Sequence, residues 1–93
     1  MKAVIVEDEV LAARNLMAIL EEIGTLQVVA TLESIHETIE WFNNHPQPDL
    51  LFLDIHLADG SAFEIFDRTT VECPVIFTTA YDEYALKAFE VNA

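Results

Sequence analysis

The feature that most constrains this chain is a run of four large hydrophobic residues that ends in a carboxylate, Leu50-Leu51-Phe52-Leu53-Asp54. Such a run does not fit a strand with one face in water, because alternate side chains of a strand point to opposite faces. It fits a strand of a parallel sheet that helices cover on both sides. Asp54 then stands at the carboxyl end of that strand, which is where open α/β sheets bind their ligands.

Strand-like and helix-like segments alternate along the rest of the chain. Three further strands are predicted at 2–6, 27–31 and 74–78, the last opened by a proline where one is tolerated. The last two helices are expected after an Asp59-Gly60 turn and over 81–91. This alternation of four strands and four helices predicts a doubly wound parallel sheet in a three-layer α/β/α domain.

The first two helices carry start and stop signals. The first is predicted to have Asp8 as its N-cap and to end before Gly24. Its apolar face is expected to consist of Ala13, Leu16, Met17, Leu20 and Ile23. The second is predicted to begin with a capping box that opens at Ser34 and to stop before Pro46. Its apolar face is expected to consist of Ile35, Ile39 and Phe42.

Composition limits the classes of function. Seventeen acidic residues against four basic ones give a formal net charge of -13, so the chain repels nucleic acid and anionic membrane surfaces. Apolar residues make up 53% of the chain, yet no apolar run reaches the ~18–20 residues that cross a bilayer. No signal peptide is apparent, and the single Cys73 cannot form an internal disulfide. We therefore expect one cytoplasmic domain that contacts neither membrane nor nucleic acid directly.

Polar side chains follow three of the predicted strands. Glu7 and Asp8 follow the first, Asp54 follows the third, and Thr79 lies at the end of the fourth. In a doubly wound sheet the first and third strands flank the switch point, so these side chains are expected in one crevice. Carboxylates this close repel one another unless a cation joins them, and oxygen ligands suit Mg²⁺. One carboxylate can then act as a nucleophile toward phosphorus, with a hydroxyl donating to a phosphoryl oxygen.

Each of these residues also has a purely structural explanation. Glu7 and Asp8 fit a role that is limited to complementing the first helix, and Asp54 fits a simple strand end. Thr79 alone is uninformative. The joint pattern, with each residue at the carboxyl end of the appropriate strand, is what favours a functional site.

Three motifs in order carry a resemblance to a known family. They are VIVEDE at 4–9 with LAAR at 11–14, DLLFLDIHLADG at 49–60, and PVIFTTAYDEYAL at 74–86. Together they resemble the receiver domain of two-component response regulators, and more closely the receivers of LytTR-type regulators. The resemblance implies a flavodoxin-like receiver fold with strand order 2-1-3-4.

The resemblance also implies a function. Asp54 would accept a phosphoryl group from a phosphohistidine of a sensor histidine kinase, with Thr79 as the switch hydroxyl. The Mg²⁺ ligands that it implies are Glu7, Asp8, Asp54 and the backbone carbonyl oxygen of His56. The phosphorylated domain would switch an output partner or an attached domain, and any DNA binding would belong to that output domain.

A complete receiver continues beyond the last predicted helix. Its fifth strand and helix, together ~17–20 residues plus loops at average lengths, include a Lys that pairs with the phosphoryl group. We therefore expect 1–93 to be a receiver domain truncated before the fifth strand. The strand at 74–78 then becomes a sheet edge with unpaired backbone groups, which predicts self-association.

Two other functions stay open at this point. A phosphorylation-independent interaction scaffold with the receiver fold would bind its partner equally well after Asp54→Asn. An aspartyl-nucleophile phosphatase needs a second Asp two positions after the nucleophile, where this chain has His56. No P-loop Gly-Lys pattern is present either. The sequence therefore favours a phosphoacceptor over an enzyme.

Overall fold

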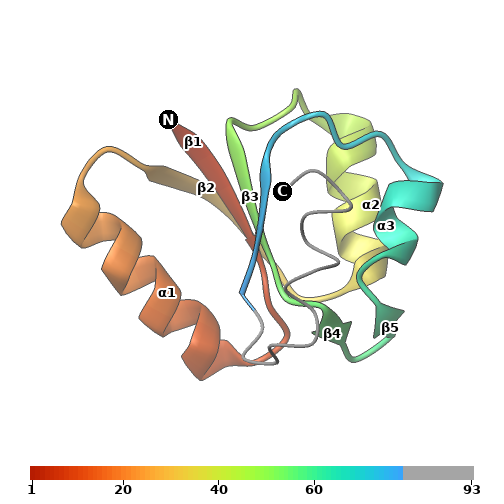
Figure 1. The fold of residues 1–93 in the computed structure, drawn as a ribbon, viewed down its shortest axis with the longest axis horizontal. Helices are drawn as coiled ribbons and strands as arrows, with labels where there is room; N and C mark the ends of the chain where they lie inside the picture. The colour runs from red at the N-terminus through yellow and green to blue at the C-terminus, as the bar shows by residue number, and fades with distance from the viewer. Residues whose placement is uncertain (79–93) are drawn as a thin grey trace.

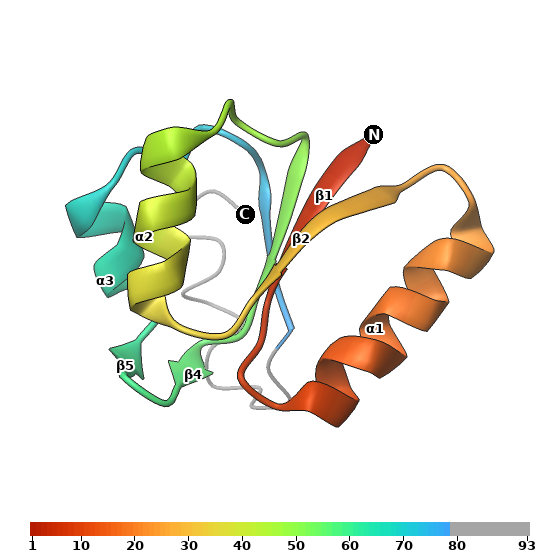
Figure 2. The same cartoon turned by 180° about the vertical axis from the view of Figure 1, so that it is seen from behind.

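A computed structural model describes residues 1–78 as a parallel sheet with helices on both faces (Figures 1 and 2). The elements are β1 (Lys2–Val6), α1 (Val10–Ile23), β2 (Gln27–Leu32), α2 (Ile35–Asn44), β3 (Leu50–Leu53), β4 (His56–Leu57), β5 (Gly60–Ser61), α3 (Glu64–Arg68) and β6 (Val75–Phe77). The helix expected over 81–91 and the predicted switch residue Thr79 lie outside the described residues. Within residues 1–78, no helix is long and apolar enough to cross a membrane.

The main sheet has the strand order β2-β1-β3-β6, and all of its pairs are parallel. This is the predicted order 2-1-3-4, and the flavodoxin-like fold is thereby confirmed. The central position of β1 and β3 explains their composition, because both strands have neighbours on either side and helices above and below. In β1, every side chain from Ala3 to Val6 is fully buried.

The sheet separates two apolar cores, and alternate residues of each strand feed one or the other. Val4, Leu51 and Leu53 belong to the larger core, which α2 and α3 cover. Ile5 and Phe52 belong to the smaller core, which α1 covers on the opposite face (Figures 1 and 2). The uninterrupted hydrophobic run of β3 is thus explained by two covered faces, as the sequence predicted.

Helix α1 differs from its prediction at both ends. Its N-cap is Glu9, not Asp8, and no side chain caps it, because the Asp8 carboxylate lies with two other acids instead. Ile23 is 56% exposed, although it was expected on the apolar face. Ile23 follows the buried Ala13 by ten residues, which at about 100° per residue places it about 80° round the helix axis. Gly24 ends the helix as predicted, in a left-handed conformation with φ of 80°.

Helix α2 begins and ends where the sequence indicated. The hydroxyl oxygen of Ser34 accepts a hydrogen bond from the Glu37 N–H at 3.0 Å. The Glu37 carboxylate accepts a hydrogen bond from the N–H of Glu33 at 3.2 Å, which holds the backbone of the residue before the N-cap. Ile35 and Phe42 are buried, which confirms the predicted apolar face.

We expect the substitution Leu53→Ala to lower the free energy of unfolding by about 2.5–5 kcal/mol, because this fully buried side chain would leave a cavity in the larger core. Urea denaturation followed by circular dichroism measures the change. The matched control is Leu11→Ala on α1, where the side chain is 73% exposed and the expected change is below about 0.5 kcal/mol. Equal losses in the two variants would contradict this description of the core.

Candidate metal and phosphoacceptor site

The three carboxylates predicted from the sequence lie together in the structure. Glu7 and Asp8 follow β1, Asp54 follows β3, and these two strands are paired neighbours. One oxygen atom from each carboxyl group lies within 4.8 Å of the others, and all three residues are half-buried. The crevice is therefore at the carboxyl ends of the central strands, where the fold predicts it.

Backbone hydrogen bonds fix the strand ends that carry these acids. The Asp54 N–H donates to the carbonyl oxygen of Val6 at 3.0 Å, and the Glu7 N–H donates to that of Leu32 at 2.9 Å. The sheet ladder thus continues one residue beyond each buried strand. Because the backbone is held in this way, the carboxyl groups need little further ordering to bind a ligand.

Glu7 carries the clearest electrostatic signature of the site. Partial burial raises the pKa of its carboxyl group to about 7, from an ordinary value of 4.5. The charge of Asp54 and hydrogen bonds with the carboxyls of Asp8 and Asp54 raise this pKa too, while the Glu9 N–H opposes them. That N–H donates to Oε2 of Glu7 at 3.1 Å. The raised pKa is the expected response of acids that are crowded together without a compensating charge.

The donor set fits a magnesium ion. All three side chains offer hard carboxylate oxygens, and the described residues contribute no sulfur or imidazole ligand to the cluster. A divalent cation held by Asp8 and Asp54, with Glu7 beside them, would remove the repulsion that raises the Glu7 pKa. Bound there, the ion would neutralise charge on phosphoryl oxygens.

The other two predicted site residues are His56 and Thr79. The His56 N–H donates to Oδ1 of Asp54 at 3.4 Å, so His56 does adjoin the acidic cluster. The role of its backbone carbonyl as a metal ligand stays a prediction. Thr79 lies outside the described residues, but the N–H of the preceding Thr78 donates to the Leu53 carbonyl at 3.1 Å. The end of β6 is therefore beside the strand that carries Asp54.

The loop after Asp54 contains an arrangement that sequence analysis did not reveal. It folds as a small antiparallel hairpin, in which β4 pairs with β5. At its tip, the Asp59 carboxylate accepts hydrogen bonds from the N–H groups of Ile35 at 3.0 Å and His36 at 3.2 Å. The Ile35 bond is the main cause that lowers the pKa of Asp59. Asp59 thus ties the loop to the first turn of α2, a contact between residues 24 positions apart.

Gly60 completes this loop for a steric reason. Its φ is 139°, a conformation that residues with a side chain rarely adopt. A Cβ atom at this position would lie 2.6 Å from Oε2 of Glu64 and 3.3 Å from Cδ1 of Ile35. The Asp59-Gly60 pair therefore combines the predicted turn with a close approach between the hairpin and two helices.

An acidic cluster at the carboxyl ends of a parallel α/β sheet fits the class of signalling receivers, and comparison with known proteins identifies that class. The profile of the response regulator receiver domain matches residues 3–93. The chain is 44% identical to the sensory transduction protein LytT of Enterococcus faecalis and 38% identical to the transcriptional regulatory protein LytR of Staphylococcus aureus. Both matches cover 100% of this chain and 39% of the relative.

Solved structures show the same fold. The response regulatory domain of mrkE from Klebsiella pneumoniae has a TM-score of 0.86 at 27% identity, over 100% of this chain and 78% of that one. The PhyR receiver domain of Erythrobacter litoralis has a TM-score of 0.76 at 30% identity, over 91% and 67% of the two chains. This chain belongs to the response regulator receiver domain family of two-component systems. Its relatives LytT and LytR agree with the LytTR-type subgroup that the sequence motifs indicated.

We expect Glu7→Gln to stabilise the metal-free domain at pH 8, by on the order of 1 kcal/mol once solvent screening of the half-exposed group is allowed for. The folded-state pKa of about 7 exceeds the ordinary 4.5, so the folded state holds a proton that the unfolded state releases in this window. Wild-type stability from this group is therefore present below pH 4.5 and lost as the pH rises through about 7.

The measurement is urea denaturation of both proteins in EDTA at pH 4.5 and pH 8. The difference between variant and wild type should be larger at the higher pH and should shrink toward the lower one. The same difference at both pH values would show that Glu7 ionises normally.

Proposed function

We propose that Asp54 is the phosphoacceptor of this receiver domain and takes its phosphoryl group from a phosphohistidine on a sensor histidine kinase. The observation that carries the proposal is the meeting of Glu7, Asp8 and Asp54 within 4.8 Å at the ends of β1 and β3. Among the three, Asp54 alone ends β3, and its carboxyl group is half-buried yet reachable from solvent. Family membership supports the same assignment.

In the proposed transfer, a carboxylate oxygen of Asp54 attacks phosphorus. The P–O bond forms while the P–N bond to the imidazole breaks, and the electron pair of that bond stays on the histidine nitrogen. Backbone hydrogen bonds hold the nucleophile in place, so its positioning is settled before the donor arrives. When bound, Mg²⁺ supplies positive charge for the phosphoryl oxygens, and Asp8, Asp54 and Glu7 would hold it.

We further propose that the domain is a phosphoacceptor and not a hydrolase. The position two residues after Asp54 is taken by His56, whose exposed side chain is not the second Asp of aspartyl-nucleophile phosphatases. No described acid other than Glu7 and Asp8 joins the cluster around Asp54. The arrangement therefore supports formation of an acyl phosphate more than its rapid turnover.

Incubation with acetyl phosphate and Mg²⁺ should add one phosphoryl group to the wild-type chain, detected by intact-mass spectrometry. Asp54→Asn should abolish the adduct because the amide cannot act as the nucleophile. Asp67→Asn removes an exposed acid on α3 and serves as the matched control that keeps the adduct. An adduct that persists in Asp54→Asn, or a folded wild-type chain that forms none, would contradict the proposal.

The proposed contact surface for the kinase is the first turn of α1. Val10 is 55% exposed and Leu11 is 73% exposed, and the two come directly after the acidic segment Glu7-Asp8-Glu9. Exposed apolar side chains beside a reactive group are typical of a surface that a protein partner covers. A kinase on this turn would bring its phosphohistidine next to Asp54.

The substitution Leu11→Ala should therefore slow phosphoryl transfer from the phosphorylated cognate kinase by about tenfold or less, the loss of one apolar contact. The rate with acetyl phosphate should not change, since this small donor needs no docking surface. Ile19→Ala, at a 56% exposed position two turns further along α1, is the matched control. Equal slowing with both donors would place the defect in the acidic site and exclude a docking role.

The chain spans 39% of the length of the curated relatives LytT and LytR, so the activity of a whole regulator extends beyond what these residues can carry. We propose that phosphorylation switches an output partner or attached domain, and that any contact with DNA belongs to it. The net charge of -13 supports this division of labour, because the domain itself repels a polyanion. A cytoplasmic location and self-association through the β6 edge stay predictions.

A further inference from the structure

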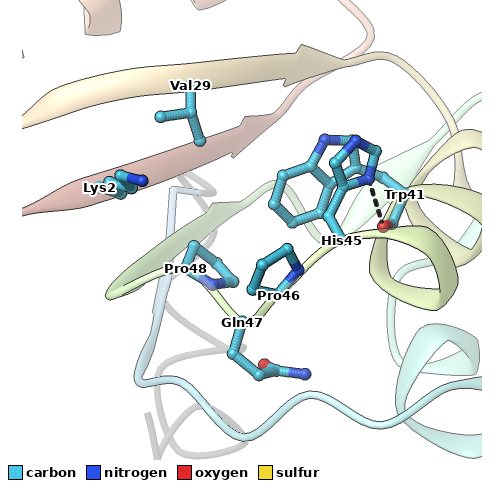
Figure 3. A pocket seen from close by; sticks show the side chains of 7 residues that line it. All are labelled: Lys2, Val29, Trp41, His45, Pro46, Gln47 and Pro48. Atoms are coloured by element: carbon cyan, nitrogen blue, oxygen red, sulfur yellow. Dashed lines mark hydrogen bonds between the residues drawn. The ribbon is translucent and has the colours of Figure 1, made fainter.

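A second cavity lies at the amino ends of the strands, opposite the acidic cluster at their carboxyl ends. It has a volume of about 260 Å³ and lies at the amino ends of β1 and β3. Lys2 and Val29 approach it from β1 and β2, while Trp41 and His45 close it from the end of α2 (Figure 3). Two proline rings of the following loop form the remaining wall (Figure 3). The phosphoacceptor chemistry uses none of these residues.

The shape of the cavity comes from an irregularity in the sheet. Between Ala3 and Val4 the register of β1 against β2 shifts, so that Val29 has no partner on β1. Val28 packs against the smaller core and Ala30 against the larger one, so the extra residue Val29 shares the α2 face with Ala30, and its side chain points into the cavity (Figure 3). Such bulges re-aim a side chain and are often found beside functional sites.

The aromatic wall is held rigidly before any ligand arrives. The His45 imidazole stacks on the Trp41 indole with a centroid separation of 4.5 Å and an interplanar angle of 9°. Nδ1 of His45 lies 2.8 Å from the Trp41 carbonyl oxygen (Figure 3). Because a carbonyl oxygen only accepts, Nδ1 carries the proton and Nε2 is left to face another partner.

The proline wall is equally well fixed. Pro46 and Pro48 each have a φ restricted by their rings, and the intervening Gln47 points its amide away from the cavity (Figure 3). That amide donates to the Thr70 carbonyl at 2.9 Å and accepts from the Glu72 N–H at 2.9 Å. The loop is thereby tied to the segment before β6, so a ligand would meet a preorganised surface.

One charged group faces this otherwise apolar and aromatic lining, the ammonium of Lys2. No ion pair to Lys2 exists within residues 1–78, and the nearby Asp49 carboxylate instead accepts from the Lys2 backbone N–H at 2.7 Å. The net charge of -13 repels anions at long range, but salt screens that field over about 8 Å. At contact distance the local ammonium therefore determines which ligand charge is favoured.

We propose that this cavity binds a small planar aromatic carboxylate. Flat rings match the prolines and the Trp41–His45 stack, and a carboxylate matches Lys2. The volume of about 260 Å³ is slightly below the usual range for drug-sized ligands, which suits one ring system and excludes a nucleotide. The site is separate from Asp54, so its occupancy does not require phosphorylation.

Trp41 provides a direct readout, since it is the only tryptophan of the chain. Titration of the full chain with phenylacetate should change the Trp41 fluorescence with a Kd on the order of 0.1–1 mM. The neutral analogue phenylacetamide and the ringless acetate should bind at least threefold more weakly, because each lacks one of the two recognised groups. No saturation with phenylacetate up to about 10 mM would overturn the proposal.

The charge contact is tested with Lys2→Met, which keeps the apolar stem of the side chain. We expect phenylacetate to bind about three- to tenfold more weakly to this variant, while phenylacetamide binding does not change. Arg68→Met on α3 lowers the net charge equally but lies outside the cavity, so it should leave both affinities as they are. Equally weakened phenylacetate binding in the two variants would show that only the overall charge matters. It would overturn the assignment of Lys2 as the partner of the carboxylate.

The aromatic wall is tested with His45→Ala, an exposed position where folding should be retained. Loss of the stacked ring should weaken phenylacetate and phenylacetamide to the same extent, and an unchanged affinity would overturn the placement of the ring. An acetylated aspartyl-phenylalanine amide is the competing probe. If it shifts the Trp41 signal and phenylacetate does not, the cavity is a docking site for a polypeptide and the proposal is wrong.

Discussion

The structure depends on the burial of β1 and β3 on both faces. Because helices cover the sheet above and below, these two strands can be almost entirely apolar and sit side by side at its centre. Their positions are fixed by backbone pairing and by two separate cores. The pairing of β1 and β3 therefore also fixes the positions of the residues that follow them directly. For this reason Glu7 and Asp54 lie in one crevice.

The acidic crevice lowers the stability of the fold that creates it. One oxygen atom from each of three half-buried carboxyl groups lies within 4.8 Å of the others, and burial together with this crowding raises the pKa of Glu7 to about 7. A structure selected for stability alone would not place acids here. The same crowding is what would favour a bound cation in the proposed phosphoryl transfer, so in this proposal local instability and function have one origin.

Helix α2 runs from the carboxyl ends of the strands back to their amino ends. Its first turn is held by Asp59, which lies in the loop that follows Asp54. Its last turn carries Trp41, and His45 follows as the C-cap, so the aromatic wall of the second cavity belongs to the same rigid element. The loop after Asp54 and the aromatic wall of the far cavity are therefore attached to opposite ends of one helix.

Some expectations failed because they treated a residue as if only its own helix mattered. Asp8 has the right chemistry for an N-cap, but it lies with the carboxyl groups of Glu7 and of Asp54, and Asp54 is supplied by the neighbouring strand β3. Ile23 continues the helical spacing of the apolar face, yet it lies at the margin of what the sheet covers. In both cases the tertiary surroundings of the residue, which no helical pattern contains, decided against the local preference.

By itself, the sequence determined the alternation of strands and helices and the convergence of Glu7, Asp8 and Asp54, while the order of the strands was implied by the family resemblance. It could do so because burial on two faces leaves an unbroken apolar run, and parallel strands place their carboxyl ends at one edge. Only the tertiary structure decided that Asp59 holds α2 from 24 residues away and that Val29, without a partner on β1, lines a cavity. These features arise from register and from contacts between distant segments, and neither leaves a periodic trace in the chain.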